Sequence, residues 1–118
     1  MFPNNLYKIT GFDVTPETVF ATISINPDHV IFEGHFPDSP VLPGVVQIQI
    51  VKELLEKHLN RTLKMKTMRT SKFLQVLNPK ETPAVCIEIK FKYGEFIEVV
   101  ASGSWENVTF FKTQVSYI

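Results

Sequence analysis

The chain contains one stretch whose residue types could support acid–base chemistry, beginning at His35, a side chain that takes and gives protons near neutral pH. Pro37, Pro40 and Pro43 follow within seven residues, and each fixes its own φ and biases the preceding residue toward an extended form. We therefore expect an ordered, stiff loop that passes through Gly44 directly into a helix. A titratable group on a rigid loop facing a helix N-terminus is an arrangement found at catalytic sites.

The same stretch resembles the signature of the β-hydroxyacyl-acyl-carrier-protein dehydratases of bacterial fatty-acid synthesis (FabZ/FabA-like). That signature reads approximately Gly-His-Phe-Pro-x-x-Pro-x-x-Pro-Gly-Val, and the residues that match it in spacing are Gly34-His35-Phe36-Pro37, Pro40, Pro43-Gly44 and Val45. Lys72-Phe73 is similar to a basic-Phe pair of the family. The resemblance implies an α+β hot-dog fold, in which a curved antiparallel sheet wraps around a central helix.

The resemblance also implies roles in removing water from a 3-hydroxyacyl thioester. This reaction needs a base for the proton beside the carbonyl, donors for charge on the thioester oxygen and a proton for the departing hydroxyl. His35 is the expected base. The Gly44 amide is the expected oxyanion donor, because unpaired N–H groups at a helix start point toward such a charge. The expected substrate contacts are Phe36, Pro43, Val45 and Phe73.

The chain departs from the family at Gln49, where the family carries an acidic residue on the helix. A glutamine can hold a hydroxyl group, but it cannot transfer a proton to it. Losing one acid is typically worth about 10²–10⁴ in rate. Glu53 lies one turn further on the same side and could supply the proton, although an ion pair with Lys57 is its more ordinary role. His35 could also return the proton itself.

Composition bounds the remaining possibilities. The 118 residues predict one domain, residues 1–118, and the 12 basic and 12 acidic side chains give no indication of nucleic acid or an anionic membrane as partner. Cys86 is the single cysteine, which excludes an internal disulfide and fits a reducing compartment. The first five residues lack a basic region and an apolar core, so we expect a cytoplasmic protein without a signal peptide. No metal-ligand spacing is present, and we expect no cofactor.

Apolar periodicity predicts one helix, residues 45–59, with two strands before it and four after it. The helix has two apolar sides, so other structure should wrap it, and Gln47 and Gln49 should need hydrogen-bond partners. Asn60 suits its left-handed C-cap. The last three strands should form an antiparallel meander because their connections are short. The expected strands are residues 6–14, 18–25, 65–76, 85–92, 96–105 and 108–117.

These observations predict a 3-hydroxyacyl-[acyl-carrier-protein] dehydratase that forms a trans-2-enoyl thioester in fatty-acid or related lipid or polyketide synthesis. Its substrate would be bound to acyl carrier protein. The resemblance implies a homodimer or higher even oligomer, in which His35 meets Gln49 of the partner, or a heterodimer with a homologue that carries Glu or Asp. Two alternatives remain: a hot-dog acyl thioesterase, and a catalytically impaired acyl-binding subunit of a heteromeric dehydratase.

Overall fold

The computed structural model describes residues 5–32 and 40–118 of the chain. The elements follow one another as two strands, a short 3₁₀ turn, the long helix and four further strands. Their bounds are β1 (Tyr7–Thr15), β2 (Thr18–Ile25), the 3₁₀ turn (Val30–Phe32), α1 (Gly44–Leu59), β3 (Met65–Phe73), β4 (Val85–Lys92), β5 (Ile97–Trp105) and β6 (Val108–Tyr117).

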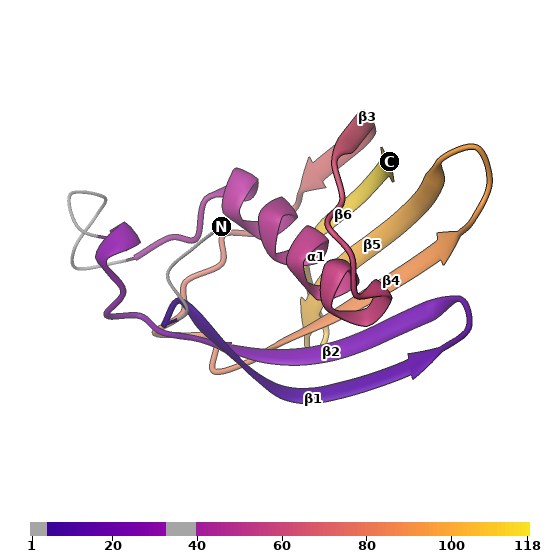
Figure 1. Ribbon diagram of the computed structural model, residues 1–118. Helices are drawn as coiled ribbons and strands as arrows, with labels where there is room; N and C mark the ends of the chain where they lie inside the picture. The colour runs from indigo at the N-terminus through magenta and orange to yellow at the C-terminus, as the bar shows by residue number, and fades with distance from the viewer. Residues whose placement is uncertain (1–4, 33–39) are drawn as a thin grey trace.

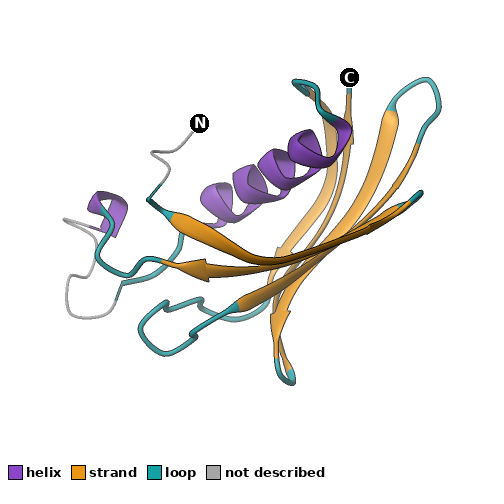
Figure 2. Cartoon of the chain, turned by 60° about the horizontal axis from the view of Figure 1, so that its bottom comes forward, coloured by secondary structure: helices purple, strands orange, loops and turns teal. Residues whose placement is uncertain are grey.

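The described strands form one antiparallel sheet in the order β1-β2-β4-β5-β6-β3. In Figure 1 the β1–β2 hairpin lies along one side of the molecule, β3 lies at the opposite side, and α1 crosses between them. Figure 2 shows the sheet curving around the helix. This is the architecture expected of the hot-dog fold, and the predicted β4–β5–β6 meander is confirmed.

The core lies between α1 and the concave face of the sheet. Strand β4 shows why, since Val85, Ile87, Ile89 and Phe91 alternate with polar residues and all four are buried. Burying such a side chain contributes about 1.5–3 kcal/mol. On the helix, the residues that complete this core are Val46, Ile50, Val51, Leu54 and Leu55.

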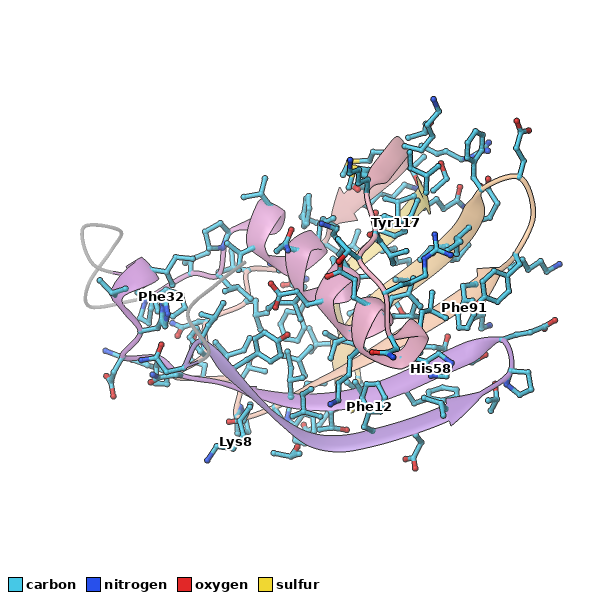
Figure 3. All side chains as sticks on the ribbon, viewed as in Figure 1. Lys8, Phe12, Phe32, His58, Phe91 and Tyr117 are labelled. Carbon is cyan, nitrogen blue, oxygen red and sulfur yellow. The ribbon has the colours of Figure 1, made fainter. Side chains whose placement is uncertain are left out.

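Helix α1 has the predicted extent, with Gly44 as its first residue rather than Val45. Its C-cap, Asn60, has φ 54° and ψ 46°, so the predicted left-handed cap is confirmed. Lys57 and His58 in the last turn complement the negative end of the helix dipole. Near this end, the His58 ring meets the Phe91 ring edge to face at a centroid distance of 5.7 Å. Both residues are labelled in Figure 3. The helix is therefore held by packing and by its C-terminal residues.

Strand β3 ends earlier than the sequence predicts. Its register with β6 stops at Phe73↔Phe111, and residues 74–76 are no longer strand, although the Leu74 N–H still donates to the Phe110 carbonyl at 2.8 Å. The backbone then turns toward the segment before α1, where Leu42 N–H donates to the Leu77 carbonyl at 2.9 Å. A strand exposed on most of its length carries little alternation, so its end could not be located from the pattern.

In the described part of the chain, no helix has both the length and the apolar character needed to cross a membrane.

Candidate active site

The N-terminus of α1 offers free backbone donors. Pro43 is the N-cap residue, with φ −62° and ψ 150°, and no side chain of a described residue caps the helix. Its carbonyl accepts from the N–H groups of Val46 and Gln47, each at 3.1 Å. Within the described residues, the N–H groups of Gly44 and Val45 have no hydrogen-bond partner. Two donors at the positive end of a helix dipole can stabilise a negatively charged oxygen.

Phe73 of β3 covers this helix start. A Cβ atom added to Gly44 would lie 2.7 Å from the Phe73 Cζ atom, closer than any side chain allows. Only glycine therefore fits beneath the ring in its present position. A hollow of about 530 Å³ opens here, and its lining includes Pro43, Gly44, Val45 and Phe73. The structure thus brings together four of the residues predicted for the site.

His35 and Phe36 lie outside the described residues, so their predicted positions stay predictions. Gln47 and Gln49 are described, and each side-chain nitrogen has a hydrogen-bond partner, but the buried Gln47 Oε1 has none among the described residues. The Gln47 side chain is buried and donates through Nε2 to the Leu42 carbonyl at 2.9 Å. Gln49 is half-buried and is not among the residues that line the hollow. In a single chain, Gln49 and the start of α1 therefore do not line the same cavity.

Gln49 belongs instead to a hydrogen-bonded chain of three side chains. Its Nε2 donates to Glu53 Oε2 at 3.2 Å, and the Tyr7 hydroxyl donates to Glu53 Oε1 at 2.9 Å. Burial raises the pKa of Tyr7, and the hydrogen bond to Glu53 and the charge of that residue raise it further. The Tyr7 hydroxyl accordingly remains a donor at neutral pH.

The prediction of an ion pair between Glu53 and Lys57 is wrong. Glu53 is occupied by Tyr7 and Gln49, while Lys57 Nζ lies over the Phe12 ring, 5.7 Å from its centroid. Tyr7 was not predicted for the site, because it lies 46 residues before Glu53 and nothing in its local sequence indicates the contact. Only the fold, in which the β1–β2 hairpin runs along the side of the molecule below α1 (Figure 1), brings them together.

A larger hollow, of about 830 Å³, lies away from the helix start and is lined by side chains such as Arg69, Lys90 and Gln114. Arg69 is already paired with Glu98 at 3.2 Å there. The volume of a hollow therefore does not identify the candidate site, whereas the unpaired amides at the start of α1 do. In the described part of the chain, no group of three or more His, Cys, Asp or Glu side chains could hold a metal ion.

A curved antiparallel sheet wrapped on one helix is the framework of a hot-dog protein. Comparison with known families assigns the chain to one family. Residues 13–104 match the model of the ApeI-like family, described as ApeI dehydratase, so the chain belongs to this dehydratase family.

Curated relatives agree with this assignment at low identity. The chain is 26% identical over 97 residues to a 3-hydroxyacyl-[acyl-carrier-protein] dehydratase FabZ from Pediococcus pentosaceus, covering 72% of this chain and 65% of the relative. It is 30% identical over 81 residues to the FabZ of Latilactobacillus sakei, covering 63% and 55%. In both cases, the match spans less than two thirds of the relative's length.

Solved structures confirm the fold. A chain of the dehydratase heterocomplex ApeI:P from Xenorhabdus doucetiae superposes with a TM-score of 0.75 at 18% identity, covering 93% of this chain and 96% of that one. A protein from Erwinia carotovora subsp. atroseptica superposes with a TM-score of 0.62 at 20% identity, covering 94% and 92%. The predicted hot-dog fold is therefore confirmed.

Proposed function

We propose that this chain acts as a 3-hydroxyacyl-[acyl-carrier-protein] dehydratase, removing water from a 3-hydroxyacyl thioester to give the trans-2-enoyl thioester. Membership of the ApeI-like dehydratase family carries the proposal, since the family match includes the whole of α1 and its N-terminus. The pathway would be fatty-acid synthesis or a related lipid or polyketide route. The cytoplasm is the compartment we propose, where the lone Cys86 would stay reduced.

In this mechanism, His35 takes a proton from the carbon next to the thioester carbonyl. The N–H groups of Gly44 and Val45 stabilise the charge that develops on the carbonyl oxygen, because both are free of other partners among the described residues. The electrons of the broken C–H bond form the new double bond, and the C–O bond to the hydroxyl breaks. The hydroxyl leaves as water once it has received a proton.

The source of that last proton is affected by one departure: Gln49 stands where the resemblance implies an acidic residue. Gln49 can hold the hydroxyl but has no acidic proton. In a site made from two copies of this chain, His35 would return the proton that it has just taken. The rate would then fall short of that of a two-group site by about 10²–10⁴.

We propose further that the active form is a dimer whose sites each join the His35 loop of one chain to Gln49 of the other. Two observations support this. Gln49 does not line the hollow at the helix start of its own chain. One edge of β3 pairs with no other described strand, and Met65, Met68 and Phe73 are each 43–49% exposed. An edge of this kind is a surface for pairing with another chain.

The second copy could be a homologue that carries Glu or Asp at the position of Gln49. The related structure from Xenorhabdus doucetiae is a dehydratase heterocomplex, which favours an assembly of unlike subunits in this family. A mixed dimer would hold one complete site, formed by His35 of this chain and the acid of its partner. The same reasoning keeps an impaired acyl-binding subunit as the second candidate function.

The test is to incubate the purified protein with a 3-hydroxyacyl thioester of acyl carrier protein and to follow enoyl absorbance and free thiol together. We expect enoyl formation, and we expect His35→Ala to abolish it without changing the far-UV circular dichroism spectrum. Thiol release without enoyl formation would establish the thioesterase alternative. Binding of the thioester with neither product would establish the impaired subunit.

A further inference from the structure

We propose that Tyr7 and Glu53 are positioning residues that fix the orientation of the Gln49 side-chain amide toward the 3-hydroxyl group of a bound thioester. The inference rests on the proposed function, because it assumes that Gln49 holds this hydroxyl. Neither residue would touch the substrate. They would act through Gln49.

The Gln49 side-chain amide has a defined orientation. A glutamine side chain carries an oxygen that accepts and a nitrogen that donates, and its two orientations fill nearly the same space. Gln49 and Glu53 are one helical turn apart, on the same side of α1. A carboxylate only accepts hydrogen bonds, so the group that meets Glu53 Oε2 at 3.2 Å must be Nε2. The Gln49 oxygen is therefore left for another partner.

The Glu53 side chain is held in one rotamer by a contact from the sheet. A glutamate on a helix has several rotamers of similar energy, and fixing one of them requires contacts that offset the lost entropy. The Tyr7 hydroxyl provides such a contact at 2.9 Å from Oε1, and it comes from β1 rather than from the helix. Each carboxylate oxygen thus has one donor. The Glu53 side chain is hydrogen-bonded to Tyr7 of β1 through one oxygen and to Gln49 through the other.

The orientation of the Gln49 amide decides which ligand groups it can bind. With its nitrogen engaged, Gln49 presents Oε1 as an acceptor, and a 3-hydroxyl group can donate to it. A 3-fluoro group has nearly the same size but no hydrogen to donate, so the oriented amide should distinguish the two. If the amide were free to rotate, it could turn an N–H toward either group, and the preference would shrink.

Two substitutions break the chain at different points. Glu53→Gln replaces the acceptor-only group with one that can face Gln49 through its oxygen or its nitrogen, so the pair can form either way round. Tyr7→Phe keeps the ring but removes the donor to Glu53. The matched controls are Glu88→Gln and Tyr93→Phe. Among the described residues, Glu88 pairs only with Lys90, at 3.8 Å, and Tyr93 makes only a ring contact with Phe91.

The experiment has a ligand arm and a ligand-free arm. In the first, calorimetry compares the Kd of pantetheine amides of 3-hydroxy and 3-fluoro acyl groups, of four to ten carbons, because the amide replaces the reactive thioester. We expect wild type to prefer the hydroxyl by about fivefold or more, the value of one well-placed hydrogen bond. Glu53→Gln should abolish the preference, Tyr7→Phe should reduce it, and both controls should keep it.

In the second arm, ¹⁵N-resolved NMR follows the Gln49 side-chain NH₂, assigned by its absence in Gln49→Ala. One of its protons should exchange slowly with water in wild type and in the controls, and rapidly in Glu53→Gln and Tyr7→Phe.

A preference for hydroxyl that survives in Glu53→Gln, or an amide whose exchange is unchanged, would overturn the positioning role and leave the proposed function standing. If no amide of the series binds wild type, the proposed function itself fails, and the positioning role fails with it.

Discussion

The two edge strands of the sheet differ in how much of their side-chain surface the chain itself covers. On β1, the partly buried Tyr7, Ile9 and Phe12 pack against the core, and Tyr7 also holds Glu53. On β3, every residue except Ser71 is exposed, and the strand pairs with β6 alone among the described strands. One edge is completed by the helix of the same chain. The other has apolar side chains that its own chain leaves in water.

This contrast explains where the candidate site lies. Phe73, at the end of the uncovered edge, reaches over Gly44, whereas Tyr7, on the covered edge, reaches Glu53 and through it Gln49. The two halves of the predicted chemistry are thus attached to opposite edges of one sheet. A partner chain on the β3 edge would supply what the single chain lacks.

The largest effect should follow from placing a charge on each edge in turn. Met68 on β3 and Val14 on β1 are both 46% exposed, so Met68→Lys and Val14→Lys are matched changes. We expect Met68→Lys to weaken dimerisation by about 100-fold or more, because charged side chains on an edge strand block pairing. Val14→Lys should leave the dimer intact. Sedimentation velocity over a concentration series measures both.

If both variants remain dimeric with unchanged affinity, the β3 edge is not the contact between chains. If wild type is itself a monomer at micromolar concentration, the two-chain site is wrong.

A smaller effect concerns two glycines that lie under phenylalanine rings. Phe73 and Phe111 face each other across β3 and β6, yet Phe73 is 49% exposed and Phe111 is 1% exposed. An added Cβ at Gly44 would meet the first ring, and one at Gly103 would overlap the second. Gly103→Ala should destabilise the fold by about 2–3 kcal/mol and lower Tm by roughly 10 °C, because a buried ring cannot move away.

Gly44→Ala should change stability by less than about 1 kcal/mol, because the exposed Phe73 ring can swing outward. The same movement would disturb the helix start, so kcat/KM for dehydration should fall by about tenfold or more. Calorimetric melting and the enoyl assay separate the two results. Equal losses of stability in the two variants would show that Phe73 is as confined as Phe111, against the contrast between edge and interior.

The smallest effect concerns two tyrosines, one on β1 and one on β6. Tyr7 donates to Glu53, whereas the Tyr117 hydroxyl is buried without a hydrogen-bond partner among the described residues. Burial raises the pKa of Tyr117 to about 12, and the charge of Glu56 adds to the shift. Tyr117→Phe should therefore be neutral or stabilising at pH 8, within about 1 kcal/mol.

The pH dependence gives a second reading of the same variant. Below pH 10, the Tyr117 hydroxyl is protonated in both the folded and the unfolded chain and contributes no pH dependence. Between pH 10 and about 12, the unfolded tyrosine loses its proton while the folded one keeps it, so stability falls as the pH rises. Urea unfolding at pH 8 and 10.5 should show a smaller fall in Tyr117→Phe than in wild type. An equal fall would mean that Tyr117 is not the group responsible.

The sequence predicted the parts of the structure that depend on local pattern. Alternation located β2 and β4, and the Asn60 cap located the end of α1. Pro43-Gly44 indicated the helix start, and the family resemblance brought in Phe73, although its contact with Gly44 joins residues 29 apart in number. These positions are fixed by backbone conformation and by residue type, which a sequence records directly.

The remainder depends on contacts between distant elements. The ion pair assigned to Glu53 was chosen by helical spacing, but the sheet delivers a closer donor in Tyr7. The end of β3 was placed three residues too late because an edge strand exposed on most of its length carries no alternation. Sequence spacing ranks neighbours on one helix and cannot rank them against a side chain from another strand.

The central claim is that each site joins His35 of one chain to residue 49 of the other. A mixed dimer of wild type with a His35→Ala/Gln49→Glu chain tests it most directly, with the two chains carrying different affinity tags and purified in tandem. If the sites form between chains, one site holds His35 with a glutamate in place of Gln49, and the other holds neither group. The new glutamate would lie beside Glu53, and a like charge raises its pKa, which suits a general acid at neutral pH.

The measurement is kcat/KM for enoyl formation by this mixed dimer and by the wild-type homodimer, on one 3-hydroxyacyl thioester. We predict that the mixed dimer is faster, by up to about 10²-fold, although it has only one working site. If each site lay within one chain, the double-variant chain would lack its base, and the mixed dimer would show at most half the wild-type rate. That result would contradict the account.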